Sequence, residues 1–188
     1  MEPMNEITIF GKTFVPYLTQ EQIEAQISRM ADEIKHDTVG RDPLFVCTMN
    51  GAFMFAAELV KRIDTTAVIG FARYSSYQGM SSSACLKEVM PLGIPVKDRL
   101  VIIMEDLVDT GYTMACLKRK YLDEGAAEVR IAAMLVKPEA LINEVTCDYV
   151  GIEIENKFIV GYGLDFDGRG RMLKDIYQIA EPTKENNQ

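Results

Sequence analysis

The segment that most limits how this chain can fold is Leu100–Thr113, which reads LVIIMEDLVDTGYT. Its first five residues are all apolar, and two adjacent carboxylates, Glu105 and Asp106, end the run. An apolar run without alternation is typical of a strand covered on both faces, as in the interior of a parallel sheet. Ligands of open α/β sheets bind beyond the carboxyl ends of the strands. The segment therefore predicts a binding site at the polar residues that follow this strand.

Strands and helices alternate along the chain, which predicts an α/β fold with a doubly wound, mainly parallel sheet flanked by helices. A first helix begins after Thr19, which has Gln22 at capping-box spacing, and it ends at turn residues 40–43. The other expected elements are a hairpin over 7–15, strands over 44–49, 66–72, 84–90, 129–136, 148–154 and 158–160, and helices over 52–63 and 112–124. No linker or repeat divides the sequence, so we expect one domain over residues 1–188.

The charge balance argues against several classes of protein. The chain has 28 acidic and 20 basic residues and a net charge of −8, so it offers no broad basic face to a nucleic acid. No segment approaches the length of a membrane-spanning helix, and the N-terminus lacks a signal-peptide stretch. The four cysteines form no C-x-x-C pair, which indicates reduced thiols. We therefore expect a cytoplasmic protein that binds neither nucleic acid nor a membrane.

The turn Asp109–Thr113 has two interpretations. A glycine-containing turn between a strand and a helix points backbone N–H groups and the positive end of the helix dipole at one spot. Together with the hydroxyls of Thr110 and Thr113, this arrangement would form a cradle for a monophosphate. The alternative is an ordinary junction in which Thr110 or Asp109 caps the helix. The spacing favours neither interpretation.

The carboxylate pair Glu105 and Asp106 also has two interpretations. Neighbouring carboxylates at the end of a buried strand repel each other unless a cation or hydroxyl donors occupy the site. The hydroxyls of a ribose would satisfy both, and Mg²⁺ could share the charge. The alternative is a solvated acidic turn, which is common in a chain with so many acids.

The complete string removes part of this ambiguity. Four or five apolar residues followed by E-D-[LIV]-[LIV]-D-T-G-x-T closely resemble the phosphoribosyl-diphosphate motif of type I phosphoribosyltransferases, with every fixed position present. Three further stretches, S-S-Y at 75–77, the strand before Lys137, and K-F-I-V-G-Y-G-L-D at 157–165, resemble the hypoxanthine-guanine phosphoribosyltransferases in particular. The resemblance implies a core over about residues 40–160 and a small hood formed by about 1–18 and 158–180.

Carried over residue by residue, the resemblance implies how the phosphoribosyl donor is bound. Glu105 and Asp106 would hold its ribose hydroxyls, and Arg171 would reach its diphosphate. Asp165, with Glu105 and Asp106, would bind a Mg²⁺ ion that the diphosphate also holds. Its 5′-phosphate would be wrapped by Thr110, Gly111, Tyr112 and Thr113.

The diphosphate loop differs from the usual form of the family. The family turn usually reads Leu-Lys-Gly and contains a non-proline cis peptide, whereas this chain has Met49-Asn50-Gly51. The glycine remains and the lysine does not, so we expect Asn50 and Gly51 to form the loop. Ser76 and Tyr77 would lie on a mobile loop that closes over the site.

The resemblance also implies how a base is recognised. Asp109 would act as general acid or base near N7 of a purine, and Lys137 would hydrogen-bond its 6-oxo group. Phe158 would stack on the ring, and the backbone of Ile159 would contact its edge. Without the motif, Lys137 would be interpreted as a surface lysine and Phe158 as a core aromatic residue.

The implied activity is Mg²⁺-dependent transfer of the 5-phosphoribosyl group to N9 of hypoxanthine or guanine, giving IMP or GMP and diphosphate. The family further implies a homo-oligomer, either a dimer or a tetramer. One alternative is a related enzyme with another base preference, such as xanthine. The other is a non-enzymatic regulator of the same fold that senses a nucleotide. Such regulators usually need a basic surface or an added nucleic-acid-binding segment, and this chain has neither.

Overall fold

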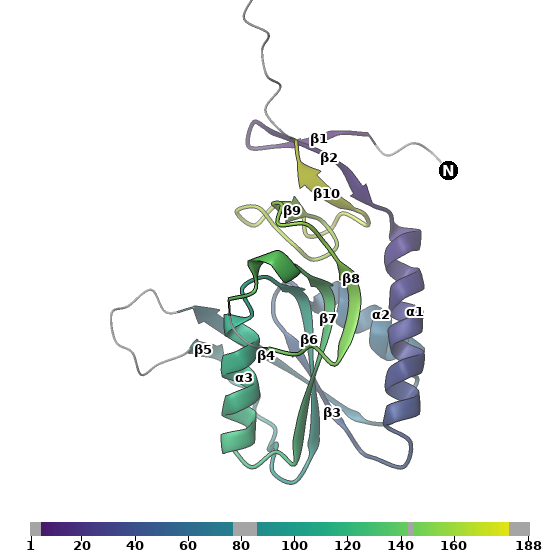
Figure 1. The fold of residues 1–188 in the computed structure, drawn as a ribbon, viewed down its shortest axis with the longest axis vertical. Helices are drawn as coiled ribbons and strands as arrows, with labels where there is room; N and C mark the ends of the chain where they lie inside the picture. The colour runs from purple at the N-terminus through teal and green to yellow at the C-terminus, as the bar shows by residue number, and fades with distance from the viewer. Residues whose placement is uncertain (1–4, 77–85, 143–144, 181–188) are drawn as a thin grey trace, which may run out of the picture.

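A central sheet of six strands carries the site, and its order is β5–β4–β3–β6–β7–β8 in the computed structural model (Figure 1). The structure describes residues 5–76, 86–142 and 145–180. The five strands from β4 to β8 in this order pair in parallel, and β5 runs antiparallel to β4. The strands are β3 Leu44–Thr48, β4 Val68–Ser76, β5 Leu86–Met90, β6 Leu100–Val108, β7 Glu128–Val136 and β8 Tyr149–Glu153.

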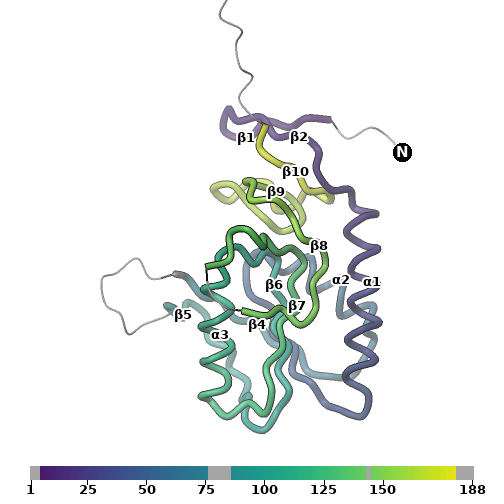
Figure 2. The backbone as a smooth tube through the Cα atoms, in the orientation of Figure 1, coloured from purple at the N-terminus to yellow at the C-terminus, as the bar shows by residue number. Residues whose placement is uncertain are grey.

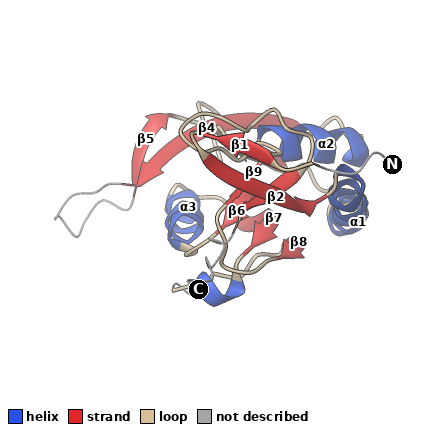
Figure 3. Cartoon of the chain, turned by 90° about the horizontal axis from the view of Figure 1, so that it is seen from above, coloured by secondary structure: helices blue, strands red, loops and turns tan. Residues whose placement is uncertain are grey.

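Helices cover both faces of this sheet, as Figure 3 shows from above. α1 (Gln20–Asp37) and α2 (Phe53–Ile63) lie on one face, and α3 (Tyr112–Asp123) lies on the other. Since successive side chains of a strand point to opposite faces, β6 contributes to both cores. Ile102 and Met104 belong to the core with α1 and α2, and the intervening Ile103 belongs to the core with α3. The apolar run in the sequence thus forms a strand buried on both faces, as predicted.

The two ends of the described chain form a second sheet, the hood, with the order β1–β2–β10–β9. Its strands are β1 Ile7–Ile9, β2 Lys12–Leu18, β9 Ile159–Val160 and β10 Ile176–Ile179. The backbone tube in Figure 2 leaves the hood through α1 and returns to it after β8. The hood lies above the carboxyl ends of the central parallel strands (Figure 1). The α/β fold with a hood is therefore confirmed.

The first helix is fixed at both ends by polar contacts. At its start, Gln22 N–H donates to Thr19 Oγ1 at 3.3 Å, and Thr19 N–H donates to Gln22 Oε1 at 2.9 Å. This reciprocal pair is the capping box that the spacing predicts. The buried Asp175, next to β10, accepts from Gln20 N–H at 2.8 Å and ties the hood to the helix.

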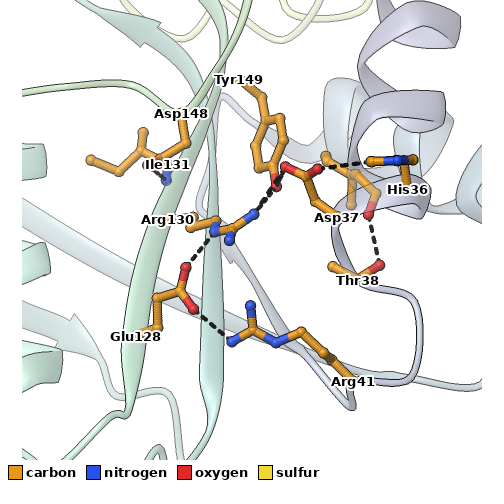
Figure 4. Close-up of polar contacts among 10 residues, drawn as sticks. His36, Asp37, Thr38, Arg41, Glu128, Arg130, Ile131, Asp148 and Tyr149 are labelled. Atoms are coloured by element: carbon orange, nitrogen blue, oxygen red, sulfur yellow. Dashed lines mark hydrogen bonds and ion pairs between the residues drawn. The ribbon is translucent and has the colours of Figure 1, made fainter.

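At the other end of α1, a polar network joins the helix to β7 and β8 (Figure 4). Arg130 Nη1 donates to Asp37 Oδ2 at 3.0 Å and to Tyr149 OH at 2.7 Å. Its Nε donates to Glu128 at 2.5 Å. His36 in this region has an 89% exposed side chain, so it is a surface residue. The network lies at the end of the sheet opposite the hood.

The structure corrects three expectations about strands. β6 does not end at the carboxylate pair, because its pairing with β7 continues through Glu105↔Ala133 to Val108↔Val136. β4 extends four residues beyond its expected end at Ala72, because it pairs with β5 as far as Ser76↔Leu86. β10 was not predicted, because its four residues give too short a periodic pattern. In the sheet of the hood it lies between β2 and β9 and pairs antiparallel with both.

Within the described part of the chain, no helix combines the length and apolar character that crossing a membrane requires. The described cysteines Cys47, Cys116 and Cys147 form no disulfide bond with one another, and the first two are buried as small apolar residues.

Replacing Thr19 tests the contribution of the capping box to stability. Thr19→Ala should lower the free energy of unfolding by about 1 kcal/mol, because it removes the acceptor for Gln22 N–H. Urea denaturation followed by circular dichroism measures the change. Thr19→Ser, which retains the acceptor oxygen, is the matched control. Equal stability of the Ala and Ser variants would show that the cap contributes nothing.

Candidate active site

The turn between β6 and α3 surrounds a small cavity at the carboxyl edge of the sheet. The cavity has a volume of 90 Å³, and its lining includes Glu105, Asp109, Thr110, Gly111 and Thr113. Its size exceeds the roughly 30 Å³ that one water occupies in the liquid. The cavity therefore has room for a small polar group beside the first turn of a helix.

The start of α3 favours the cradle interpretation of this turn. The N-cap is Gly111, with φ +77°, and it has no side chain to cap the helix. Neither Asp109 nor Thr110 is the N-cap, although Thr110 Oγ1 accepts a long hydrogen bond of 3.4 Å from Tyr112 N–H. The helix N-terminus thus faces the cavity without a capping carboxylate, and an anion is favoured at such a position.

Glu105 lies on the α3 face of β6, at the wall of this cavity. Burial raises the pKa of its carboxyl group well above the usual value, and the neighbouring Asp106 raises it further. The Thr48 hydroxyl, at the end of β3, lies within hydrogen-bond reach of the Glu105 carboxylate. The pair is therefore not the solvated acidic turn that the sequence left open, because Glu105 is half-buried within β6 and contacts the Thr48 hydroxyl.

Asp106 points to the opposite face, toward the turn that precedes α2. Its carboxylate contacts Gly51 so closely that a Cβ built there would lie 1.7 Å from Asp106 Oδ2. Burial raises the pKa of Asp106 to about 6, although backbone N–H groups and Arg171 oppose the shift. The charge of Asp165 raises this pKa further. A ligand that brings hydroxyl donors or a cation would relieve both carboxylates.

A loop of the hood lies against the same turn. A Cβ built on Gly163 would lie 2.0 Å from the Gly51 carbonyl oxygen, so the two backbones are in direct contact. Arg171 Nη1 donates to the Gly163 carbonyl at 2.7 Å, and Arg171 Nη2 lies 2.5 Å from Asp165 Oδ1. The loop therefore brings one cation and one carboxylate next to Asp106. The Met49–Asn50 peptide is cis, as the resemblance implies.

Lys137 and Asp109 meet where β7 and β6 end side by side. Lys137 Nζ lies 3.5 Å from Asp109 Oδ2, and the lysine is only 6% exposed whereas Asp109 is half-exposed. Lys137 is consequently not the surface lysine of the alternative interpretation. A buried ammonium group beside an accessible carboxylate presents a donor and a proton-exchanging group to the same ligand edge.

Phe158 contributes an aromatic face from the hood. Its side chain is 46% exposed, so it is not the core aromatic residue of the alternative interpretation. The ring stands edge-on to Phe166, with centroids 5.6 Å apart, and lies 6.2 Å from Phe14. Ile159, which follows, is buried in β9. The supported but exposed ring of Phe158 is suited to stacking on a flat ligand.

The carboxylate oxygens at this site suit Mg²⁺ only if a substrate supplies further oxygen ligands. Asp106 and Asp165 supply the carboxylate oxygens that hard cations prefer. However, among the described residues no group of three or more His, Cys, Asp or Glu side chains is placed to hold a metal ion. Mg²⁺ commonly takes one or two carboxylates plus phosphate oxygens and water, so the residues present fit that partial role.

Two of the predicted site residues lie at or beyond the end of β4. Ser76 is the last residue of β4, and Tyr77 lies outside the described residues. One site residue was missed from the sequence: Thr48, which contacts Glu105. The available signal was its position as the single polar residue at the end of the apolar run Leu44–Cys47.

Comparison with known proteins agrees with this geometry. The family described as "Phosphoribosyl transferase domain" matches residues 16–167. A hypoxanthine-guanine phosphoribosyltransferase of Streptococcus thermophilus is 37% identical over 87% of this chain and 91% of its own length. One of Mycobacterium tuberculosis is 36% identical over 85% and 82%, respectively.

A solved structure of a hypoxanthine phosphoribosyltransferase from Staphylococcus aureus superimposes with a TM-score of 0.82. It is 30% identical in sequence and covers 88% of this chain and 90% of its own. The likeness thus covers most of the chain. The chain belongs to the phosphoribosyltransferase family and, within it, to the hypoxanthine-guanine phosphoribosyltransferases.

Proposed function

We propose that this protein transfers the 5-phosphoribosyl group from 5-phosphoribosyl 1-diphosphate to N9 of hypoxanthine or guanine, releasing diphosphate. The observation that carries the proposal is the adjacency of three features at one sheet edge. They are the cavity at the start of α3, the half-buried carboxylate pair, and the Lys137–Asp109 pair. This arrangement supports binding a sugar phosphate on one side and a base on the other.

The donor would be held by complementary polar groups. The 5′-phosphate would occupy the cradle at the N-terminus of α3, where the helix dipole favours an anion. The ribose hydroxyls would donate to Glu105 and Asp106, whose ionised forms are disfavoured by burial without a ligand. Arg171 would bind the diphosphate with Mg²⁺ coordinated by Asp165 and the carboxylate pair, and that ion would neutralise charge on the leaving group.

The base would be selected by its group at C6. A 6-oxopurine presents the acceptor O6, and Lys137 has only donors to offer. A 6-aminopurine would instead present hydrogens to the buried ammonium group, so it would be rejected. Phe158 would stack on the ring plane, which fixes the tilt of the base. The neighbouring Asp109 would lie near N7.

The reaction needs no covalent enzyme intermediate. Loss of diphosphate from C1 gives the ribose oxocarbenium character, and N9 attacks the same carbon. Asp109 would take up or return the proton at N7 as the base becomes a nucleophile. Most of the rate would come from alignment of the two substrates and from preorganised charge. A cytoplasmic location and a homo-oligomeric assembly form part of the same proposal.

A spectrophotometric assay with each free base tests the proposed function. Purified protein with the donor and Mg²⁺ should turn over hypoxanthine or guanine and should leave adenine and pyrimidines unchanged. Removal of Mg²⁺ with a chelator should abolish turnover. Turnover of xanthine would establish the alternative base preference. Donor binding without any turnover would instead establish a regulator.

Replacing Asp109 tests its role in proton transfer. Asp109→Asn should lower kcat by about 10²- to 10⁴-fold, because the amide cannot exchange the N7 proton. Donor affinity, measured by isothermal titration calorimetry, should change little. Asp98→Asn, at the opposite end of β6, is the matched control and should behave as the unaltered protein does. Equal losses in kcat and donor affinity would assign Asp109 to donor binding instead.

Replacing Lys137 tests the recognition of the 6-oxo group. Lys137→Met retains an apolar stem and removes the donor, so KM for hypoxanthine should rise by about 10- to 100-fold. KM for the donor should stay within experimental error. The control is Lys97→Met, at an exposed position before β6. A rise in the donor KM alone would show that Lys137 does not contact the base.

A further inference from the structure

We propose that Thr48 is a positioning residue for the reaction, whose hydroxyl directs the Glu105 carboxylate toward the ribose hydroxyls of the bound substrate. The inference rests on the proposed function, because it assigns a task to a residue behind the sugar-binding carboxylate. Nothing in the phosphoribosyl-diphosphate motif includes this position, which lies on a different strand from the motif.

Thr48 is a polar side chain in an apolar environment. It ends β3, whose preceding residues Leu44–Cys47 are all buried and apolar, and it is itself only 8% exposed. A hydroxyl in such a place costs free energy unless it is hydrogen-bonded. Its Oγ1 lies 2.7 Å from the Met104 carbonyl oxygen and within hydrogen-bond reach of Glu105 Oε2. Both partners lie on β6, so the contact crosses from one central strand to the next.

The register of the sheet explains why this contact forms. Cys47 pairs with Met104 in the parallel ladder, which brings the next residues, Thr48 and Glu105, level with each other. By strand alternation, Thr48 shares the face of Val46, and Glu105 shares the face of Ile103. Both of those apolar residues belong to the core with α3. Thr48 and Glu105 therefore meet on the α3 face, beside the cradle.

Thr48 acts through Glu105 rather than on the ligand. The lining of the 90 Å³ cavity includes Glu105, and Thr48 is not among its described lining residues. Fixing one carboxylate oxygen with the hydroxyl orients the group, and the other oxygen is left for the sugar. Because the rotamer of a buried side chain is set by its packing and hydrogen bonds, removing this donor should loosen the group that binds the ribose.

The test compares two ligands that differ only in the sugar hydroxyls. IMP carries both hydroxyls, and 2′,3′-dideoxyinosine 5′-monophosphate carries neither. Calorimetric titration should show that Thr48→Val weakens IMP binding by about tenfold or more. Binding of the dideoxy nucleotide should be nearly unchanged. Thr48→Ser retains the hydroxyl and should restore IMP affinity. Valine keeps the β-branched shape that suits a strand.

The outcomes distinguish the positioning role from its alternatives. Equal weakening of both nucleotides by Thr48→Val would show a purely structural role and overturn the inference, as would unchanged IMP affinity. Thr48→Ala, a second variant without the hydroxyl, gives the same comparison if the valine protein does not fold. If the unaltered protein turns over a 6-oxopurine, but Thr48→Val does not weaken IMP binding more than binding of the dideoxy nucleotide, only the inference fails. If the unaltered protein binds no IMP and has no turnover, the proposed function fails with it.

Discussion

The rest of the structure depends on one constraint, the burial of β6 on both faces. A strand at the centre of a parallel sheet withdraws its side chains from water on either side, and Leu100–Met104 are all buried. Pairing with β7 continues past Met104, where the next three residues are half-buried. The alternation of the strand then sends Glu105 to the α3 face and Asp106 to the α2 face. Two adjacent residues thereby place one carboxylate on each face of the sheet. Burial raises the pKa of both carboxyl groups.

The neighbours of the two carboxylates include segments that are distant in the sequence. Thr48 reaches Glu105 from β3, whereas Gly51 and the loop with Arg171 surround Asp106. A Cβ at Gly163 would meet the Gly51 carbonyl oxygen, and a Cβ at Gly51 would meet the Asp106 carboxylate, so neither position has space for a side chain. The close approach explains why glycine is required at the turn after β3, even though the neighbouring Asn50 differs from the lysine that the family usually has there.

Much of this arrangement could be predicted from the sequence, because its signals are local. The capping box of Thr19, the apolar face of α1 and the turn at Gly111 are each set by residues a few positions apart. The hood pairing of β10 could not be predicted, since its partners are contributed by both ends of the chain. Thr48 was missed for the same reason: the lateral register of β3 against β6 gives the hydroxyl its partner.

The order of strands in the hood has a consequence for synthesis of the protein. β10 lies between β2 and β9, and the contact from Gln20 N–H to Asp175 spans 155 residues. A nascent chain can thus assemble the six-stranded sheet, including the cradle, before the strand that joins the two sides of the hood leaves the ribosome. The hood, which presents the exposed ring of Phe158, can therefore be completed only after nearly the whole chain has been synthesised.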